Sequence, residues 1–476
     1  MKSFRLIFVL VLALGLLLPG QTSLARQTEA DGPIYIVQEG DSLWSIALRF
    51  RVSMSDLENI NQISNPNQLA VGMRLVIPGL EGIQGVLVTR DVAYGETMLS
   101  ISRRYQIPVE MLVRLNHLTS PAELFAGATL VLLEQNASSS PTRRTMLLPG
   151  QSLLEMAMAQ GGNPWNYVLS NDLDGTWDGI PGDVFHLPNP EISAQVTEGP
   201  SALPEAITAV ELKPEPFIQG KAAVIRVSGE DGLSMAGTLN GHPLHFFPDG
   251  HGSYVGLQGI YAMTEPGLYT MVITGTLPDQ TPYFKAPFAI SQAVYILGGE
   301  YPFDPPLAVS PETIDPAVTK PEEAQWAALT APVTAEKLWD GIFQSPAQDP
   351  YKDCYPSRFG NRRSYNGSAY IYFHTGLDFC GGVGNQVSAP AAGIVVFAGP
   401  LTVRGNATLI NHGWGVYSGY LHQSELKVKA GDHVEAGQVI GLVGGTGRVT
   451  GPHLHWEIWV GGFQVDPLDW LEQVYP

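Results

Sequence analysis

The chain has 476 residues, of which 44% are apolar, so it can form about three domains with packed cores and is not wholly disordered. Its 26 Lys and Arg residues face 45 Asp and Glu residues, and the net charge of −19 argues against nucleic acid or anionic lipid as the main partner. The presence of only two cysteines excludes a disulfide-dense scaffold and a four-thiolate zinc site.

The first 25 residues have the three parts of a secretory signal peptide. Lys2 and Arg5 are followed by an apolar run at 6–18 and by small residues at 23 and 25. This run is too short to cross a hydrocarbon core of about 30 Å comfortably. We therefore predict that residues 1–25 are a cleaved signal peptide. The mature protein is then secreted or in the cell envelope, extracellular or periplasmic, with no integral membrane segment after cleavage.

A repeat with a period of 55 residues organises the N-terminal part. Gly40, Gly95 and Gly150 are spaced by this period, and the residues around them align without gaps. Self-similarity at a fixed period indicates repeated structural units. The apolar patterns and capping residues in each unit predict the order strand, helix, helix, strand. The predicted units are residues 33–79, 86–134 and 143–190.

The first unit carries the segments YIVQEGDSLWSIALRF, NINQI and LAVGMRLVIP, and it resembles a lysin motif (LysM) domain. The resemblance implies a small α+β module of βααβ order that binds N-acetylglucosamine-containing glycans in peptidoglycan or chitin. The second unit is similar but lacks the tryptophan, and the third is degenerate. The alternative that these two units only space the first from the rest of the chain stays open.

Residues 206–293 are predicted to form an all-β sandwich. Short apolar or alternating stretches are separated by Gly- and Pro-containing turns, at the spacing expected for this architecture. In this pattern alone the region resembles a bacterial immunoglobulin-like domain. It contains His242, His245 and His251, but no carboxylate lies at ligand spacing from them, so we do not expect a metal site here.

Residues 294–345 are predicted to be a Pro-rich linker. The part at 302–335 is rich in Pro, Ala, Glu and Thr and is typical of a linker or an extended wrap. Because it directly precedes the C-terminal domain, we also consider that it occludes a groove there and keeps an enzyme latent. Removal of 302–335 should then raise activity.

The C-terminal region, residues 346–476, carries a pattern typical of metal chemistry. His374 and Asp378 lie four residues apart, and His453 and His455 alternate on a predicted strand, which places both imidazoles on one face. Two histidines and a carboxylate would leave a fourth zinc position open, as in catalytic zinc sites. His422 and the imidazole that does not bind metal could then accept a proton from water. The alternative, strongest for His422, is that these are ordinary strand histidines.

The region 357–471 closely resembles the lysostaphin-type zinc endopeptidases, the LytM family. The similarity runs in order through SRFG, HTGLD, VSAPAAGIV, NHG, YLH, VKAGD, GQVIG and TG…GPHLH. It implies a mostly antiparallel β domain whose zinc lies in a groove and whose substrates are peptide crosslinks of bacterial peptidoglycan. By this resemblance His374, Asp378 and His455 bind Zn²⁺, His453 is the general base, and His422 steadies the developing oxyanion. The last two roles can be shared, and their division stays open.

Both cysteines lie in the C-terminal region, residues 346–476. Cys380 follows Asp378 by two residues and could be a rival soft ligand, but the family has no such role. In an exported protein, a Cys354–Cys380 disulfide that braces the site is the preferred interpretation.

Taken together, the sequence predicts a secreted zinc metalloendopeptidase. Its LysM domains would bind peptidoglycan glycan strands, and its C-terminal domain would hydrolyse stem peptides or crosslinks of the cell wall. The alternative is a non-catalytic wall-binding protein that regulates or activates another hydrolase. The complete set of predicted ligands and spare histidines favours the enzyme.

Overall fold

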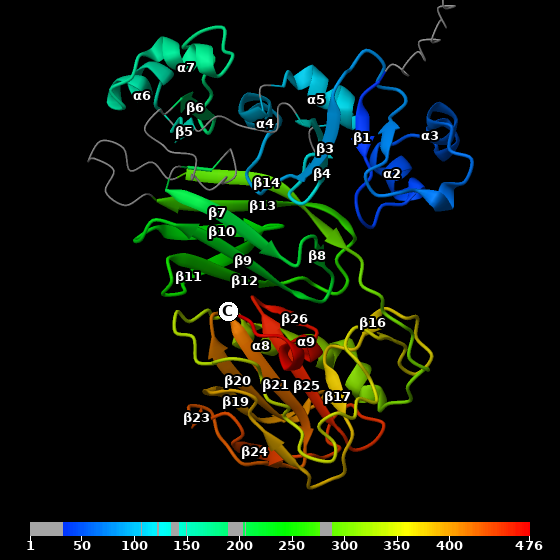
Figure 1. Ribbon diagram of the computed structural model, residues 1–476. Helices are drawn as coiled ribbons and strands as arrows, with labels where there is room; N and C mark the ends of the chain where they lie inside the picture. The colour runs from blue at the N-terminus through cyan, green and yellow to red at the C-terminus, as the bar shows by residue number, and fades with distance from the viewer. Residues whose placement is uncertain are drawn as a thin grey trace, which may run out of the picture. The chain divides into compact units, whose positions relative to one another are not determined.

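A computed structural model describes residues 32–105, 107–120, 123–134, 142–148, 150–188, 203–204, 206–276 and 288–476 (Figure 1). The predicted signal peptide lies outside the described residues. The described residues divide into two compact units, those within 1–88 and 133–135 and those within 89–132 and 136–476. No helix among the described residues is long and apolar enough to cross a membrane.

The first unit contains a small α+β module. Strand β1 pairs antiparallel with β2 and in parallel with the first residues of β3. Ser42 caps helix α2 reciprocally with Ser45, which satisfies amide groups that the helix leaves free at its N-terminus. The elements are β1 (Ile34–Ile36), α2 (Leu43–Arg49), α3 (Met54–Asn61), η1 (Pro66–Gln68), β2 (Arg74–Val76) and β3 (Val86–Asp91).

Two further sets of elements follow, each in the predicted order of strand, helix, helix and strand. The first strand of the earlier set is β3. The later pair of strands, β5 and β6, is antiparallel. The elements are α4 (Met98–Tyr105), α5 (Val109–Asn116), β4 (Thr129–Leu133), β5 (Thr142–Met146), α6 (Leu153–Ala159), α7 (Pro164–Ser170) and β6 (Val184–Pro188).

One asparagine per repeat ties the second helix to the last strand. The Asn61 side chain donates to the carbonyls of Leu57 and Val76 and accepts the Val76 N–H. Asn116 and Asn171, each 55 residues further on, make the same three bonds. The repeat therefore preserves a hydrogen-bonding role as well as a residue type, and the third copy retains it.

The middle region is all-β, as predicted (Figure 1, green). The eight strands among its described residues are hydrogen-bonded in the order β7-β9-β12-β11-β10-β13-β14-β8, and the two halves of β11 pair with different neighbours. Leu212 of β7 and Ile290 of β14, near opposite ends of this order, share one buried core. Its finer assignment as an immunoglobulin-like domain stays a prediction. The strands are β7 (Ile207–Lys213), β8 (Phe217–Ile218), β9 (Ala222–Gly229), β10 (Ser234–Leu239), β11 (His242–Pro248), β12 (Ser253–Gly259), β13 (Gly267–Thr276) and β14 (Phe288–Leu297).

The segment expected to be a linker contains a 15-residue helix. After η4 (Pro311–Ile314), helix α8 (Pro316–Thr330) begins with Asp315 as its cap and Pro316 at its first position, where proline costs no hydrogen bond. Trp326 of α8 is fully buried against Leu409, Tyr417 and other residues of the C-terminal sheet. The structure therefore differs from a linker, because burying this tryptophan favours a packed helix over an extended chain.

The C-terminal domain is built on antiparallel strands, as predicted. A seven-stranded sheet has the order β17-β25-β21-β20-β19-β23, with β26 also paired to β25, and a small sheet has the order β18-β24-β22. The elements are β15 (Arg362–Arg363), β16 (Tyr372–Phe373), β17 (Leu377–Phe379), β18 (Gln386–Ser388), β19 (Gly393–Leu401), β20 (Gly405–Gly413), β21 (Val416–Gln423), β22 (Glu425–Leu426), β23 (His433–Val434), β24 (Val439–Leu442), β25 (Leu454–Val460), β26 (Phe463–Val465) and α9 (Pro467–Glu472).

Candidate metal centre and groove

Three side-chain atoms from β17, its neighbour β25 and the segment before β17 meet at one point. Asp378 of β17 lies directly opposite His455 of β25 in the antiparallel register, and His374 precedes β17. Asp378 Oδ1 lies 2.9 Å from His374 Nε2 and 2.8 Å from His455 Nδ1, and the two nitrogens are 2.9 Å apart. All three residues are buried. The structure thus brings together the three residues predicted as metal ligands.

The second nitrogen of each imidazole already has a partner. His374 Nδ1 lies 2.8 Å from the carbonyl of Arg358, and His455 Nε2 lies 3.4 Å from a carboxylate oxygen of Glu457. Since these partners only accept, each partnered nitrogen carries the hydrogen and the other nitrogen presents a lone pair. Two nitrogen lone pairs and a carboxylate oxygen therefore face one another, which requires a cation or a proton between them. This donor set fits Zn²⁺.

The two predicted catalytic histidines border the same point. His453 Nε2 lies 3.5 Å from Asp378 Oδ1, and the rings of His422 and His453 are 5.2 Å apart. Nδ1 of His453 donates to the Gly451 carbonyl, and Nδ1 of His422 donates to the Thr446 carbonyl, each at 2.8 Å. Both imidazoles therefore offer the lone pair of Nε2 as a proton acceptor.

Burial and neighbouring charges shift the pKa values of the cluster. Burial lowers the pKa of His374 to about 4. Burial would raise the pKa of Asp378, but His374 and His455 outweigh it and hold the value well below the usual range. Burial and the nearby imidazoles of His455 and His453 lower the pKa of His422. At neutral pH the carboxylate is therefore charged and His422 is neutral, as a cation site with an adjacent base requires.

Gly376 is needed for close approach. A Cβ on this residue would lie 2.7 Å from His455 Nε2 and 2.3 Å from the Trp456 carbonyl oxygen, so any other residue would displace the strand that carries this predicted ligand. Gly376 therefore allows the segment before β17 to lie close against β25.

Two charged residues around the cluster were not predicted, the largely buried Arg363 and the buried Glu457. Arg363 Nη2 donates to Asp378 Oδ2 at 3.2 Å, on the oxygen that faces away from the imidazoles. Glu457, two residues after His455 on the same face of β25, also accepts hydrogen bonds from Thr375, Trp459 and Gln464. Strand alternation could have identified Glu457, whereas Arg363 has no comparable signal in the sequence.

The cluster opens into a groove of about 710 Å³. His422, His453, His455 and Asp378 line it from the sheet, and residues between 304 and 323 line it from the segment that contains α8. Cys354 and Cys380, whose Cα atoms are 5.4 Å apart, form a disulfide beside β17. The disulfide holds the strand that carries Asp378, and Cys380 is thereby not available as a ligand.

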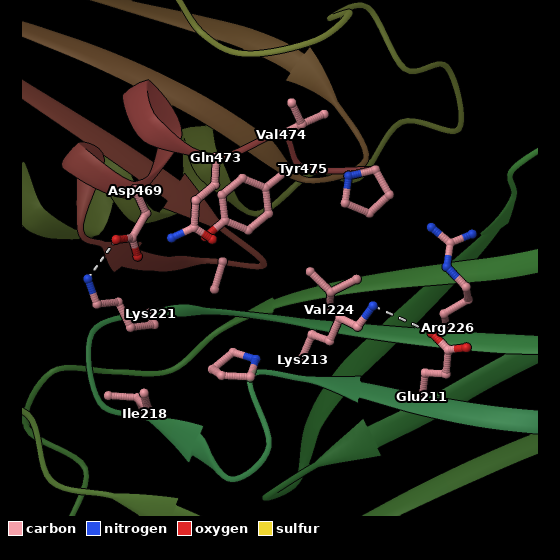
Figure 2. A pocket seen from close by; sticks show the side chains of 13 residues that line it. Glu211, Lys213, Ile218, Lys221, Val224, Arg226, Asp469, Gln473, Val474 and Tyr475 are labelled. Carbon is pink, nitrogen blue, oxygen red and sulfur yellow. Dashed lines mark hydrogen bonds and ion pairs between the residues drawn. The ribbon is translucent and has the colours of Figure 1, made fainter.

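A second pocket, of about 590 Å³, lies where β7 and β9 face the C-terminal residues (Figure 2). Lys221 pairs with Asp469 at 2.7 Å, Lys213 with Glu211 at 3.7 Å, and Arg226 with Asp249 outside the pocket. These cations are neutralised by carboxylates of the chain, so we assign no ligand to this pocket.

Comparison with known proteins confirms both resemblances. Residues 372–467 match the model of peptidase family M23, and residues 35–78 and 91–133 match the LysM domain model. The third repeat lies outside these matches, and its assignment as a LysM-like unit stays a prediction. The chain thus carries an M23 peptidase domain and two LysM domains.

The relatives resemble this chain over part of its length. Peptidoglycan DD-endopeptidase ShyA of Vibrio cholerae is 41% identical over 112 residues, which are 24% of this chain and 26% of ShyA. DD-carboxypeptidase/endopeptidase Mpg of Neisseria meningitidis is 44% identical over 95 residues, which are 20% of this chain and 22% of Mpg. The chain thus spans about a quarter of the length of these relatives. A crystal structure of a putative peptidase M23 from Pseudomonas aeruginosa aligns at 24% identity, covering 55% of this chain and 97% of that chain, with a TM-score of 0.40, too low to support a conclusion.

Proposed function

We propose that this protein is an exported zinc metalloendopeptidase that binds peptidoglycan and hydrolyses its peptide crosslinks or stem peptides. The observation that carries the proposal is the set of three lone-pair atoms that face one another within a groove, with two further imidazoles beside them. The M23 match and the DD-endopeptidase activity named for the relatives support a peptide bond of the cell wall as substrate. In this proposal His374, Asp378 and His455 hold Zn²⁺.

The chain's own residues supply the proton transfers. A Zn²⁺ held by these three residues would polarise the scissile carbonyl and lower the pKa of the attacking water. His453, whose Nε2 lone pair faces the site, takes the proton of that water as its oxygen adds to the carbonyl carbon. The same proton then goes to the leaving amide nitrogen as the C–N bond breaks.

His422 contributes in a second protonation state. In its neutral form Nε2 can only accept, so His422 can donate a hydrogen bond to an oxyanion only after it has itself gained a proton. Because the rings of His422 and His453 are 5.2 Å apart, both can reach the same reacting group. We therefore propose that the two histidines share the roles of base and oxyanion stabiliser.

The LysM domains would hold the enzyme on its insoluble substrate. Trp44 of the first module is 64% exposed, and an exposed tryptophan suits stacking against a sugar ring. Tethering to glycan raises the effective concentration of crosslinks at the groove without any new contact in the active site. We therefore propose that the protein acts in the cell envelope or outside the cell.

The test is digestion of purified peptidoglycan by the purified protein, with and without a zinc chelator, followed by mass spectrometry of the new amino termini. We expect cleavage that the chelator stops, that added Zn²⁺ restores, and that His453→Ala abolishes. His433→Ala is the matched control, because His433 is an exposed histidine of β23 in the same domain. Wall binding without cleavage by a zinc-loaded protein would favour the non-catalytic regulator instead.

A further inference from the structure

Arg363 is a buried cation placed between two carboxylates. Its side chain is 14% exposed, and Nη2 donates to Asp378 Oδ2 while Nε donates to Asp304 Oδ2, both at 3.2 Å. A cation this poorly hydrated needs compensating charge. Asp378 alone could provide it, but Asp378 is also the one carboxylate of the proposed metal site.

Asp304 contacts the supports of two proposed ligands. Besides Arg363, it accepts hydrogen bonds from Ser357 Oγ at 3.2 Å and from Asn361 Nδ2 at 2.7 Å. Ser357 Oγ lies 3.2 Å from His374 Nδ1, and the Asn361 carbonyl accepts the His374 N–H. A single intervening residue therefore connects Asp304 to each of the proposed ligands, Arg363 to Asp378 and Ser357 to His374.

The backbone holds Asp304 in this place. Its N–H donates to the Arg362 carbonyl at 2.9 Å, and its own carbonyl accepts from the Tyr370 hydroxyl at 3.0 Å. Phe303 forms an isolated parallel bridge with Arg362. These contacts fix a residue from the segment 302–335 against the strand that carries Arg363.

The charge of Asp304 affects the cation site through Arg363. With Asp304 ionised, Arg363 is neutralised from the outside and Asp378 keeps its charge for the metal. Without that charge, Arg363 would be compensated by Asp378 alone and would also repel a divalent cation nearby. Both effects weaken metal binding, and neither requires Asp304 to touch the metal.

We propose that Asp304 is a positioning residue that supports Zn²⁺ binding by neutralising Arg363, which in turn orients Asp378. The inference rests on the proposed zinc site, and it changes the interpretation of the segment 302–335. This segment is then a constitutive part of the metal site, and not a latency device. Deletion of 302–335 cannot distinguish a structural role from latency, because it would also remove Trp326, which is buried against the C-terminal sheet.

The test is the zinc dissociation constant at pH 7, measured by competition with a chromophoric chelator. Asp304→Asn keeps the size of the side chain and removes its charge. We expect zinc affinity to fall about tenfold, the lower end of the loss typical when an outer partner of a metal ligand is changed. In an Arg363→Gln background the same substitution should have little effect, because Asp304 then has no cation to neutralise.

Two control variants separate charge from structure. Glu323→Gln removes an exposed carboxylate of the same segment that lines the same groove. Asn361→Ala removes a hydrogen bond of Asp304 but leaves its charge. Both should retain zinc affinity near that of the wild type. Thermal unfolding in chelator, measured for every variant, reports whether the metal-free fold is intact.

Unchanged zinc affinity in a folded Asp304→Asn protein would overturn the inference, above all if peptidoglycan cleavage rises, as expected for removal of an inhibitory contact. If Asp304→Asn lowers zinc affinity equally in the wild-type and Arg363→Gln backgrounds, Asp304 does not act through Arg363. If Asp304→Asn does not fold, Asn361→Ala and Asp304→Glu replace it in the test, because both keep the carboxylate charge. Equal losses of zinc affinity in these two variants would reject the charge argument. A wild-type protein that binds zinc but cleaves nothing would reject the proposed function and leave this inference testable.

Discussion

Glu322 and Arg404 form a buried ion pair that fastens helix α8 to the turn before β20, with 3.0 Å between Oε1 and Nη1. Glu322 also accepts the backbone N–H groups of Val403 and Arg404. The Arg404 carbonyl in turn accepts the N–H of His422, whose φ of 64° is left-handed. The helix from the expected linker therefore supports the backbone of a proposed catalytic histidine.

We predict that Glu322→Ala destabilises the protein by about 3 kcal/mol, because it leaves Arg404 buried without its counter-charge. The midpoint of urea unfolding, measured for the C-terminal domain's tryptophan fluorescence, checks this value. Cleavage by the remaining folded protein should also fall, since His422 loses support. Glu323→Ala, an exposed neighbour on the same helix, should change stability by less than about 0.5 kcal/mol. Equal effects of the two substitutions would contradict the role of the pair.

Glu457→Gln should weaken zinc binding by about 10- to 100-fold. The Glu457 carboxylate accepts the Nε2 hydrogen of His455 and so holds the tautomer in which Nδ1 faces the metal site. A glutamine can instead donate to Nε2 and favour the tautomer that turns the hydrogen of Nδ1 toward the site. Competition with a chromophoric chelator measures the change. Glu425→Gln, at an exposed carboxylate of β22, should leave the affinity unaltered.

His412 should make the protein sensitive to acid. Burial lowers its pKa from 6.5 to about 4, and the ring is held neutral between the Ala392 carbonyl and the Ser418 hydroxyl. A lowered folded-state pKa means that the unfolded chain binds the proton first. Stability from this residue is therefore complete above about pH 6.5 and is lost as the pH falls toward about 4, to a total of about 3 kcal/mol.

His412→Gln removes this titration, so the unfolding free energy of the variant should fall less steeply than that of the wild type between pH 6.5 and 4. The difference in slope should correspond to the uptake of about one proton on unfolding. Urea unfolding at several pH values, with chelator present to exclude metal effects, compares the slopes. The exposed His433→Gln serves as the control and should keep the wild-type slope. Parallel profiles for wild type and His412→Gln would mean that His412 does not contribute.

Trp44→Ala should weaken binding to insoluble peptidoglycan about tenfold, as expected for an exposed aromatic residue that contacts the ligand. Cleavage of a small soluble crosslinked fragment should not change, because Trp44 lies outside the peptidase domain. Sedimentation with peptidoglycan measures binding. Trp177→Ala, at an exposed tryptophan of the third repeat, tests that repeat separately. Loss of soluble-fragment cleavage in Trp44→Ala would contradict a purely tethering role.

The features that the sequence predicts well are those that recur locally. The spacing of Gly40, Gly95 and Gly150 identified three units whose helices and strands follow the expected order. The alternation of His453 and His455, together with the spacing of His374 and Asp378, limited the expected metal site to these four residues. The resemblance to the lysostaphin-type endopeptidases then implied His455, which lies opposite Asp378 in the register of β17 and β25. Local hydrogen bonding and side-chain periodicity determine such features, so they are visible without the fold.

The tertiary structure alone decided how this cluster is supported. Asp304 precedes Arg363 by 59 residues and Glu322 precedes Arg404 by 82, and no periodicity joins such pairs. The segment between 302 and 335 has the composition of a linker, yet Trp326 is fully buried and the segment contributes carboxylates to two largely buried cations. The sequence determined which residues can bind a metal and transfer a proton. Packing determined which charges are buried, because desolvation depends on neighbours that are distant in the chain.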